Sequence, residues 1–185
     1  MKIKLIDGFK IRNTVDIDFS VIGDDSVYPF IKSGEVWFDK SFANEKDFFL
    51  ELFKKRKILT KKYGYEKAKQ MLRSKLKTSE DLRLELIDEI EEIKIHLIDG
   101  TLLRQNLDPS FCFGGHWKVY DYIPQGEVWI DNVPKKEEQK YIIIHELYEL
   151  DLMTQGKKYN NAHDFANAAE KEARRNDGVA SYPND

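Results

Sequence analysis

The chain carries two copies of one segment, and this duplication constrains its fold more than any other feature. Residues 2–39 and 94–131 align at a constant offset of 92 positions without a gap, and 18 of the 38 aligned pairs are identical. Unrelated segments do not match at this level, so the chain is a tandem pair of homologous units. We place them at residues 1–92 and 93–185 and expect them to pack through a pseudo-two-fold interface.

The same order of elements is expected in each copy. A β-prone stretch ends in an Asp-Gly turn, and two further β-prone stretches follow, at 27–31 and 34–38 in the first copy. The period then becomes helical, at 44–64 and 65–76 in the first copy and at 135–156 and 160–175 in the second. Asn160 or Asn161 is the expected N-cap of the last helix, an extra helix is expected from Ser79 onward, and the tail from Asp177 is expected to fray. The predicted class is α+β, with a small antiparallel sheet covered by two or three helices in each copy.

Composition excludes several classes of protein. The 30 Lys and Arg residues balance 33 Asp and Glu residues, which argues against a nucleic-acid-coating protein. No apolar run is long enough to cross a bilayer, and the charged N-terminal stretch does not match a signal peptide. Because Cys112 is the single cysteine, no internal disulfide can form, and a cytoplasmic location is the default expectation.

The two copies differ most where chemistry is expected, since all four histidines lie in the second copy. The segment HELYE, residues 145–149, belongs to a predicted helix that is apolar almost all round and therefore buried. His145 and Glu149 are one turn apart and can converge, with Glu146 on the same arc. A buried carboxylate without a partner costs several kcal/mol, so a metal ion or charged hydrogen bonds should compensate it.

The following helix offers a second set of polar groups. His163 and Glu170 share one face, beside an alanine stripe that permits close packing on the HELYE helix. His145, Glu149 and His163, with Glu170 as a fourth candidate, form a donor set for zinc or a similar divalent ion. Glu146 would then act as general base. Two alternatives stay open: an ordinary exposed histidine–glutamate pair, and a buried polar network without metal.

Other polar and aromatic residues of the second copy are interpreted as structural. His116 aligns with Asp24 of the first copy, so nothing in the alignment requires a histidine there. Tyr148 and Tyr159 are interpreted as packing residues near the core.

One part of the second copy resembles a known family. The segment GEVWIDNVPKKEEQKYIIIHELYEL, residues 126–150, with AHDFA at 162–166, is similar to zincin-like metallopeptidases, the minimal gluzincins of the ImmA/IrrE group above all. The resemblance implies that His145 is a metal ligand and Glu146 the general base. It places Glu149 at the second ligand position, as HExxE instead of HExxH. The family's third ligand, a glutamate, has no acidic counterpart at Tyr159 or Asn160, so His163 would substitute.

Two functions of different classes follow. The first is a zinc-dependent hydrolase, a zincin-like peptidase acting on a peptide or protein, with its site in the second copy and a degenerate first copy. Phe53, Lys54 and Lys57 stand at the first-copy positions of His145, Glu146 and Glu149. The second is a non-catalytic tandem protein-interaction module, with a structural metal or a polar network at the same helices.

Overall fold

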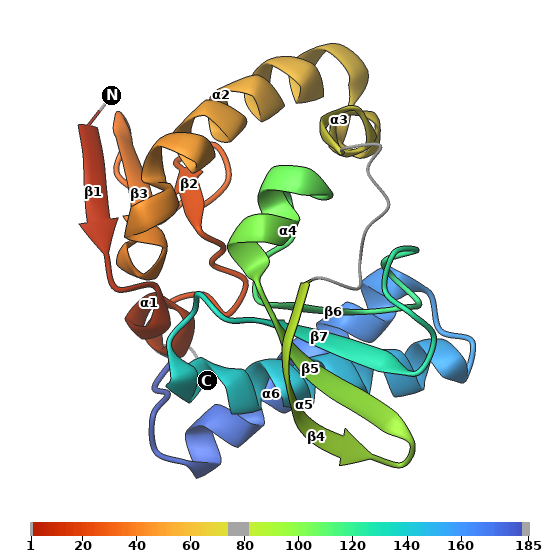
Figure 1. The fold of residues 1–185 in the computed structure, drawn as a ribbon. Helices are drawn as coiled ribbons and strands as arrows, with labels where there is room; N and C mark the ends of the chain where they lie inside the picture. Colours follow the sequence, from red (N-terminus) through yellow and green to blue (C-terminus); the bar gives the residue numbers. More distant parts are fainter. Residues whose placement is uncertain (1, 74–81, 183–185) are drawn as a thin grey trace.

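The computed structural model describes residues 2–73 and 82–182, and its class is α+β, as predicted (Figure 1). The first part of the chain forms β1 (Lys2–Ile6), α1 (Gly8–Thr14), β2 (Ile22–Asp24), β3 (Glu35–Asp39), the 3₁₀ helix η1 (Lys40–Glu45), α2 (Lys46–Tyr63) and α3 (Tyr65–Leu72). The second part forms β4 (Arg83–Ile90), β5 (Ile93–Ile98), α4 (Gly100–Asn106), β6 (Gly114–His116), β7 (Glu127–Asp131), α5 (Lys136–Thr154) and α6 (Tyr159–Asn176).

The strand pairing repeats at the offset seen in the sequence. Lys2 of β1 lies opposite Glu35 of β3, and Lys94 of β5 lies opposite Glu127 of β7, both in parallel pairs. β2 and β6 then pair antiparallel with β3 and β7. The two sheets, ordered β1-β3-β2 and β4-β5-β7-β6, are therefore mixed, and the expected antiparallel sheet is wrong in this respect. The connection from β1 to β3 contains a helix and a strand, which gives the chain room to return in the same direction.

The Asp-Gly pairs begin helices and are not turns between strands. The side chain of Asp7 accepts a hydrogen bond from the amide of Lys10 and caps α1, and Asp99 caps α4 in the same way. A Cβ atom on Gly8 would lie 1.8 Å from a carboxylate oxygen of Asp39, so only glycine fits there.

The β-prone stretches at 27–31 and 119–123 form turns and not strands. The amide of Tyr28 donates to the carbonyl of Asp24, and the amide of Tyr120 donates to that of His116. The aromatic rings that gave these stretches their β-propensity pack against the sheet glycines, where a Cβ on Gly23 would lie 2.3 Å from the Tyr28 ring. The neighbouring short strands β2 and β6 supply the pairing instead.

The helix expected from Ser79 onward is also wrong: residues 79–81 lie outside the described residues, and 83–90 form strand β4. β4 and β5 form an antiparallel hairpin closed by Glu91 and Glu92, which both have positive φ. Such a two-residue turn normally carries Asn or Gly, so the acidic sequence gave no turn signal. The repeated sequence of the second copy begins in β5, after this turn. The second sheet begins one strand earlier, at β4.

The last helix lies within one residue of its predicted bounds at each end, but its N-cap and the tail that follows it depart from expectation. α6 begins at Tyr159 after Lys158, without a side-chain cap from either expected asparagine. The tail packs through residue 182: the amide of Ser181 donates to the carbonyl of Asn13 at 2.9 Å, and the Tyr182 hydroxyl donates to the carbonyl of Arg12 at 2.5 Å. The C-terminal tail thus ties the second copy to α1 of the first.

One long helix covers each sheet, and each makes a separate apolar core. Helix α2 packs on the first sheet and α5 on the second. The buried residues of the two cores are Val21, Ile22, Val36, Phe38, Phe42, Phe49, Leu52 and Phe53 in the first, and Ile95, Val128, Ile130, Ile142 and Leu150 in the second. Figure 1 shows α1 beside α5 and α6 at the junction of the two units.

Buried arginines join the units at this junction. Arg12 of α1 donates to Asp39 of its own copy at 2.9 Å and to Glu138 of α5 in the other copy, also at 2.9 Å. All three side chains are buried. A buried charge needs such partners, because an unpaired one would cost several kcal/mol.

The aligned arginine repeats the arrangement in the opposite direction. Arg104 of α4 contacts Asp131 of its own copy and donates to Glu45, which precedes α2 of the first copy, at 2.9 Å. Each copy thus sends one arginine to a carboxylate at the start of the other copy's long helix. This reciprocity is the contact pattern of the expected pseudo-two-fold interface.

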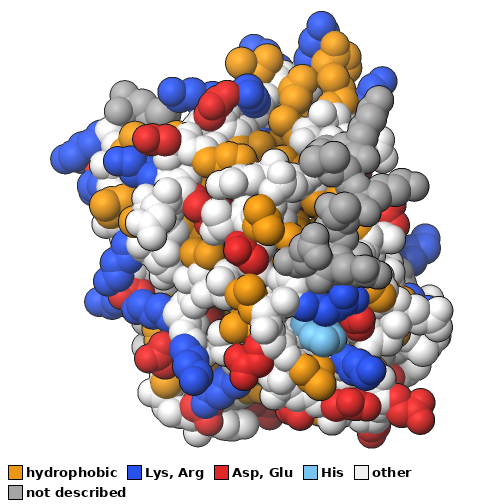
Figure 2. Space-filling model, viewed as in Figure 1, with side chains coloured by type: hydrophobic (Ala, Val, Ile, Leu, Met, Phe, Trp, Pro, Cys, Tyr) orange, Lys and Arg blue, Asp and Glu red, His pale blue; other side chains and the backbone are white. Residues whose placement is uncertain are grey.

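The surface carries charges of both signs. Figure 2 shows acidic and basic side chains interspersed on the face that it draws. No helix among the described residues is both long enough and apolar enough to span a membrane.

Candidate metal centre

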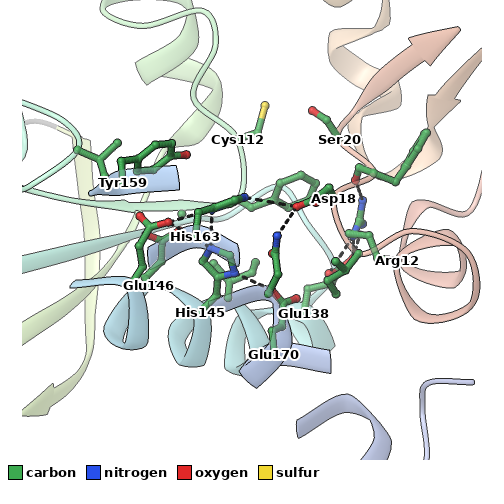
Figure 3. A pocket seen from close by; sticks show the side chains of 18 of the residues that line it. Arg12, Asp18, Ser20, Cys112, Glu138, His145, Glu146, Tyr159, His163 and Glu170 are labelled. Atoms are coloured by element: carbon green, nitrogen blue, oxygen red, sulfur yellow. Dashed lines mark hydrogen bonds and ion pairs between the residues drawn. The ribbon is translucent and has the colours of Figure 1, made fainter. Parts of the chain in front are cut away.

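Helices α5 and α6 bring the predicted site residues together. Ala162 and Ala166 of α6 are fully buried, as the predicted alanine stripe requires. Close packing of α5 and α6 places His145 of α5 against His163 of α6 (Figure 3). Glu149 of α5 contacts His163 as well.

Three donor atoms converge on one point. The His145 Nε2 and His163 Nδ1 atoms lie 3.1 Å apart, His163 Nδ1 lies 2.9 Å from Glu149 Oε2, and His145 Nε2 lies 3.7 Å from the same oxygen. Two ligand atoms of a tetrahedral zinc ion, each about 2.0–2.2 Å from the metal, lie roughly 3.3–3.6 Å apart. The three observed distances bracket this separation, so the donor set fits a zinc-sized cation.

Glu170 lies behind this set and does not join it. Its Oε2 atom is 3.0 Å from His145 Nδ1, the ring nitrogen that faces away from Glu149 and His163. Arg174 holds the other carboxylate oxygen from two of its nitrogens, at 2.7 and 2.9 Å. A carboxylate on the far nitrogen fixes the tautomer and ring orientation of a metal-binding histidine, which is the role the structure offers Glu170.

His116 is a site residue that the sequence reasoning missed. It is fully buried, and its Nε2 atom lies 3.0 Å from Glu149 Oε1, the oxygen that faces away from His145 and His163. Its Nδ1 atom accepts a hydrogen bond from the amide of Lys118, so in the neutral ring Nε2 carries the proton and donates to Glu149.

The proton on His116 Nε2 also affects a second group of possible metal ligands. Nitrogen and oxygen atoms of His116, Glu146 and Glu149 lie within 4.8 Å of one another and could in principle hold another ion. Because the proton on His116 Nε2 occupies the lone-pair position that a metal would need, we assign His116 to orienting Glu149.

Glu146, a member of the second group, lies on α5 and faces the cavity (Figure 3). Within residues 2–73 and 82–182, no hydrogen-bond or ion-pair partner contacts its carboxylate, although only 9% of the residue is exposed. Burial raises the pKa of Glu146 from 4.5 to about 7. A carboxylate with a pKa near neutrality can both take up and release a proton at physiological pH.

The pKa values of the donors follow from their neighbours. Burial lowers the pKa of His145, but hydrogen bonds to Glu149 and Glu170 outweigh it and raise the value to about 10. Asp18 and Glu149 raise the pKa of His163 to about 9. Burial raises the pKa of Glu149, but its three histidine neighbours outweigh that effect and hold the pKa well below 4.5. The cluster therefore concentrates charge in a buried place, as functional sites do.

A cavity of about 230 Å³ opens beside the donors, and both copies line it. The first copy contributes Asp18, Phe19 and Ser20, among others, while the second contributes the donors and Tyr120. Asp18 lies 3.4 Å from His163 Nε2. The tyrosines differ in position: Tyr159 stacks on the His163 ring at 5.5 Å and lines the cavity, whereas Tyr148 does not line it.

The equivalent place in the first copy has lost the donors. Phe53, at the position of His145, is buried in the first core. Lys57, at the position of Glu149, pairs with Asp24, which aligns with His116. A polar contact thus links the same two aligned positions in both copies. The contact is Lys57 with Asp24 in the first copy and Glu149 with His116 in the second.

The comparisons with known proteins return nothing: no family model matches the chain, and neither a curated protein nor a solved structure matches it.

Proposed function

We propose that this protein is a zinc-dependent hydrolase of the zincin type that cleaves peptide bonds at the α5–α6 site. The observation that carries the proposal is the convergence of His145, Glu149 and His163 at the wall of a cavity. Beside them lies Glu146, whose carboxylate has no hydrogen-bond or ion-pair partner among the described residues. Structural zinc sites normally have four protein ligands, whereas catalytic ones keep three and leave a position open. Three donors that face a cavity favour the catalytic type.

Each residue of the site has a separate role in the proposed reaction. When bound, a zinc ion would polarise the scissile carbonyl and lower the pKa of a water molecule. Glu146 accepts the proton of the attacking water and returns it to the leaving amine, for which its pKa of about 7 is suited. Glu170 orients His145 and His116 orients Glu149, each through the atom that faces away from the other donors.

The choice of peptides as substrates rests on the resemblance of residues 126–170 to the zincin-like metallopeptidases. The cavity adds a compatible feature, because its wall includes the apolar side chains of Ile17, Phe19 and Ile142 next to the polar donors. Binding sites typically combine apolar walls with a few oriented polar groups.

A second candidate is a non-catalytic interaction module, and one observation favours it. Within the described ranges, no fully buried side-chain nitrogen or oxygen lacks a hydrogen-bond partner. One proton on His163 Nδ1 accounts for its contacts with both Glu149 and His145, so the cluster is also consistent with a metal-free polar network.

Hydrolysis of a mixed peptide library, followed by mass spectrometry, separates the two candidates. The zinc-loaded wild type should cleave, and a chelator should abolish cleavage. Glu146→Gln should lower the rate by about 10²–10⁴-fold while retaining zinc, because Glu146 moves a proton and is not a ligand. Glu172→Gln, on an exposed position of α6, is the matched control and should cleave normally. Bound zinc without any cleavage by the wild type would support the interaction module.

A further inference from the structure

The first copy has Phe53 and Lys57 at the positions of His145 and Glu149, yet one of its side chains reaches the candidate centre. Asp18 lies in the segment between α1 and β2 and lines the cavity opposite α6. Its Oδ1 atom is 3.4 Å from His163 Nε2, the ring nitrogen that faces away from Glu149 and His145 (Figure 3). The other contacts of His163 engage Nδ1.

Asp18 is held in this place from two sides. Asn167 of α6 donates to Asp18 Oδ1 at 2.8 Å. The hydroxyl of Tyr28, in the core of the first copy, donates to the Asp18 carbonyl at 3.0 Å and accepts from the amide of Ser20 at 2.9 Å. The aligned residue in the second copy is Ser110, so this carboxylate is particular to the first copy.

Each of the three donors now has a partner on its far side. Glu170 contacts Nδ1 of His145, and His116 contacts Oε1 of Glu149. Asp18 does the same for His163 Nε2. Partners of this kind fix ligand orientation and raise ligand basicity, and their loss typically weakens metal binding 10- to 100-fold.

A second connection leads from the donors into the first copy. Arg174, which holds Glu170, also donates to Asn13 Oδ1 of α1 at 2.8 Å and to Glu138 at 3.0 Å. Glu138 in turn accepts from Arg12 of α1. The orientation of His145 therefore depends on the same interface as that of His163.

We propose that the first copy is an integral half of the metal centre: Asp18 positions His163 across the interface, so that cation binding and the docking of the two copies stabilise each other. This inference rests on the proposed metal site and adds a role for the first copy. Asp18 is a positioning residue and not a ligand, since it reaches the nitrogen opposite the converging donors.

The first test is the zinc affinity of the full-length protein, measured by competition with a chelating dye. Asp18→Asn should weaken zinc binding roughly tenfold, at the low end of the usual range because its side chain is 55% exposed. Asp18→Ala, which also removes the hydrogen-bond acceptor, should weaken it further. Asp25→Asn, at an exposed position of the same copy, is the matched control and should bind like the wild type.

The second test separates positioning from mere structural support. Zinc should slow amide hydrogen exchange in residues 15–21 of the wild type, although no proposed ligand lies there, and this protection should shrink in Asp18→Ala. Metal-free Asp18→Asn should melt close to the metal-free wild type, while its zinc-induced rise in Tm should be smaller.

The outcomes are distinguishable. If the wild type takes up no zinc, the proposed metal site and this inference both fail. If the wild type binds zinc and Asp18→Ala binds it equally well, or if zinc protects only α5 and α6, the proposed metal site stands and the role of the first copy is overturned.

Discussion

Glu146→Gln should stabilise the metal-free protein, and this stabilisation should depend on pH. Glu146 is almost fully buried, and burial raises the pKa of its carboxyl from 4.5 to about 7. A raised carboxyl pKa means that the folded protein prefers the protonated form. The ionised form therefore costs stability as the pH rises from 4.5 through 7, and the cost is complete above the folded-state pKa.

The magnitude follows from the two pKa values. A tenfold change in proton affinity corresponds to about 1.4 kcal/mol, so the change from 4.5 to about 7 corresponds to about 3 kcal/mol at pH 8. At pH 5 most of the folded molecules keep the proton, and the cost falls to about 1 kcal/mol. Glutamine is neutral at both values, so Glu146→Gln should gain about 2 kcal/mol more stability at pH 8 than at pH 5.

Urea unfolding in the presence of a chelator, at pH 5 and at pH 8, measures this difference. Glu172→Gln, an exposed change on α6, controls for the general effect of replacing a glutamate. An equal effect of Glu146→Gln on the free energy of unfolding at both pH values would refute the reasoning. A destabilisation confined to pH 8 would show that the ionised carboxylate has a favourable partner and is not held ready for proton transfer.

Three further predictions concern other parts of the molecule. Zinc should raise the Tm of the wild type but not that of His145→Ala, as differential scanning calorimetry would show; an equal rise would place the ion elsewhere. Arg104→Ala should destabilise the protein by about 3–5 kcal/mol in urea unfolding, because Glu45 and Asp131 would remain buried without a cation; a loss below 1 kcal/mol would contradict this. Burial raises the pKa of Cys112 to about 12, so at pH 8 iodoacetamide should alkylate the native protein about 1,000-fold more slowly than the unfolded chain, and comparable rates would refute it.

The duplication made much of the fold predictable. A gapless offset of 92 fixes the same register in β1–β3 and β5–β7, and the two long helices follow their apolar periods. Features that depend on tertiary pairing were not predictable. β4 has an acidic, helix-like sequence and becomes a strand because β5 offers it an edge, and their turn uses Glu91 and Glu92 where a glycine would have signalled it.

The candidate site was predictable where it lies on α5 and α6, because both helices have a clear sequence pattern. His145 and Glu149 follow from spacing on α5, and the meeting with His163 follows from the alanine stripe of α6. A single aligned position gives no reason to include His116, because the first copy has Asp24 there. Two aligned positions taken together would have indicated His116. The first copy has Asp24 and Lys57 there, the second has His116 and Glu149, and the two residues of each pair contact each other.

Asp18 had no signal in the sequence. Its approach to His163 depends on how the two copies dock, and neither periodicity nor the alignment encodes that contact directly. The aligned Ser110 gives no hint of a carboxylate at the site.

The central claim is that imidazole and carboxylate groups of α5 and α6 hold one divalent cation. Its most direct test is the zinc content of the full-length protein, determined by elemental analysis after loading with zinc and removal of excess metal by gel filtration. The wild type should retain one zinc ion per chain, and the His145→Ala and Glu149→Ala variants close to none. A wild-type content close to zero, or equal contents in all three proteins, would contradict the claim.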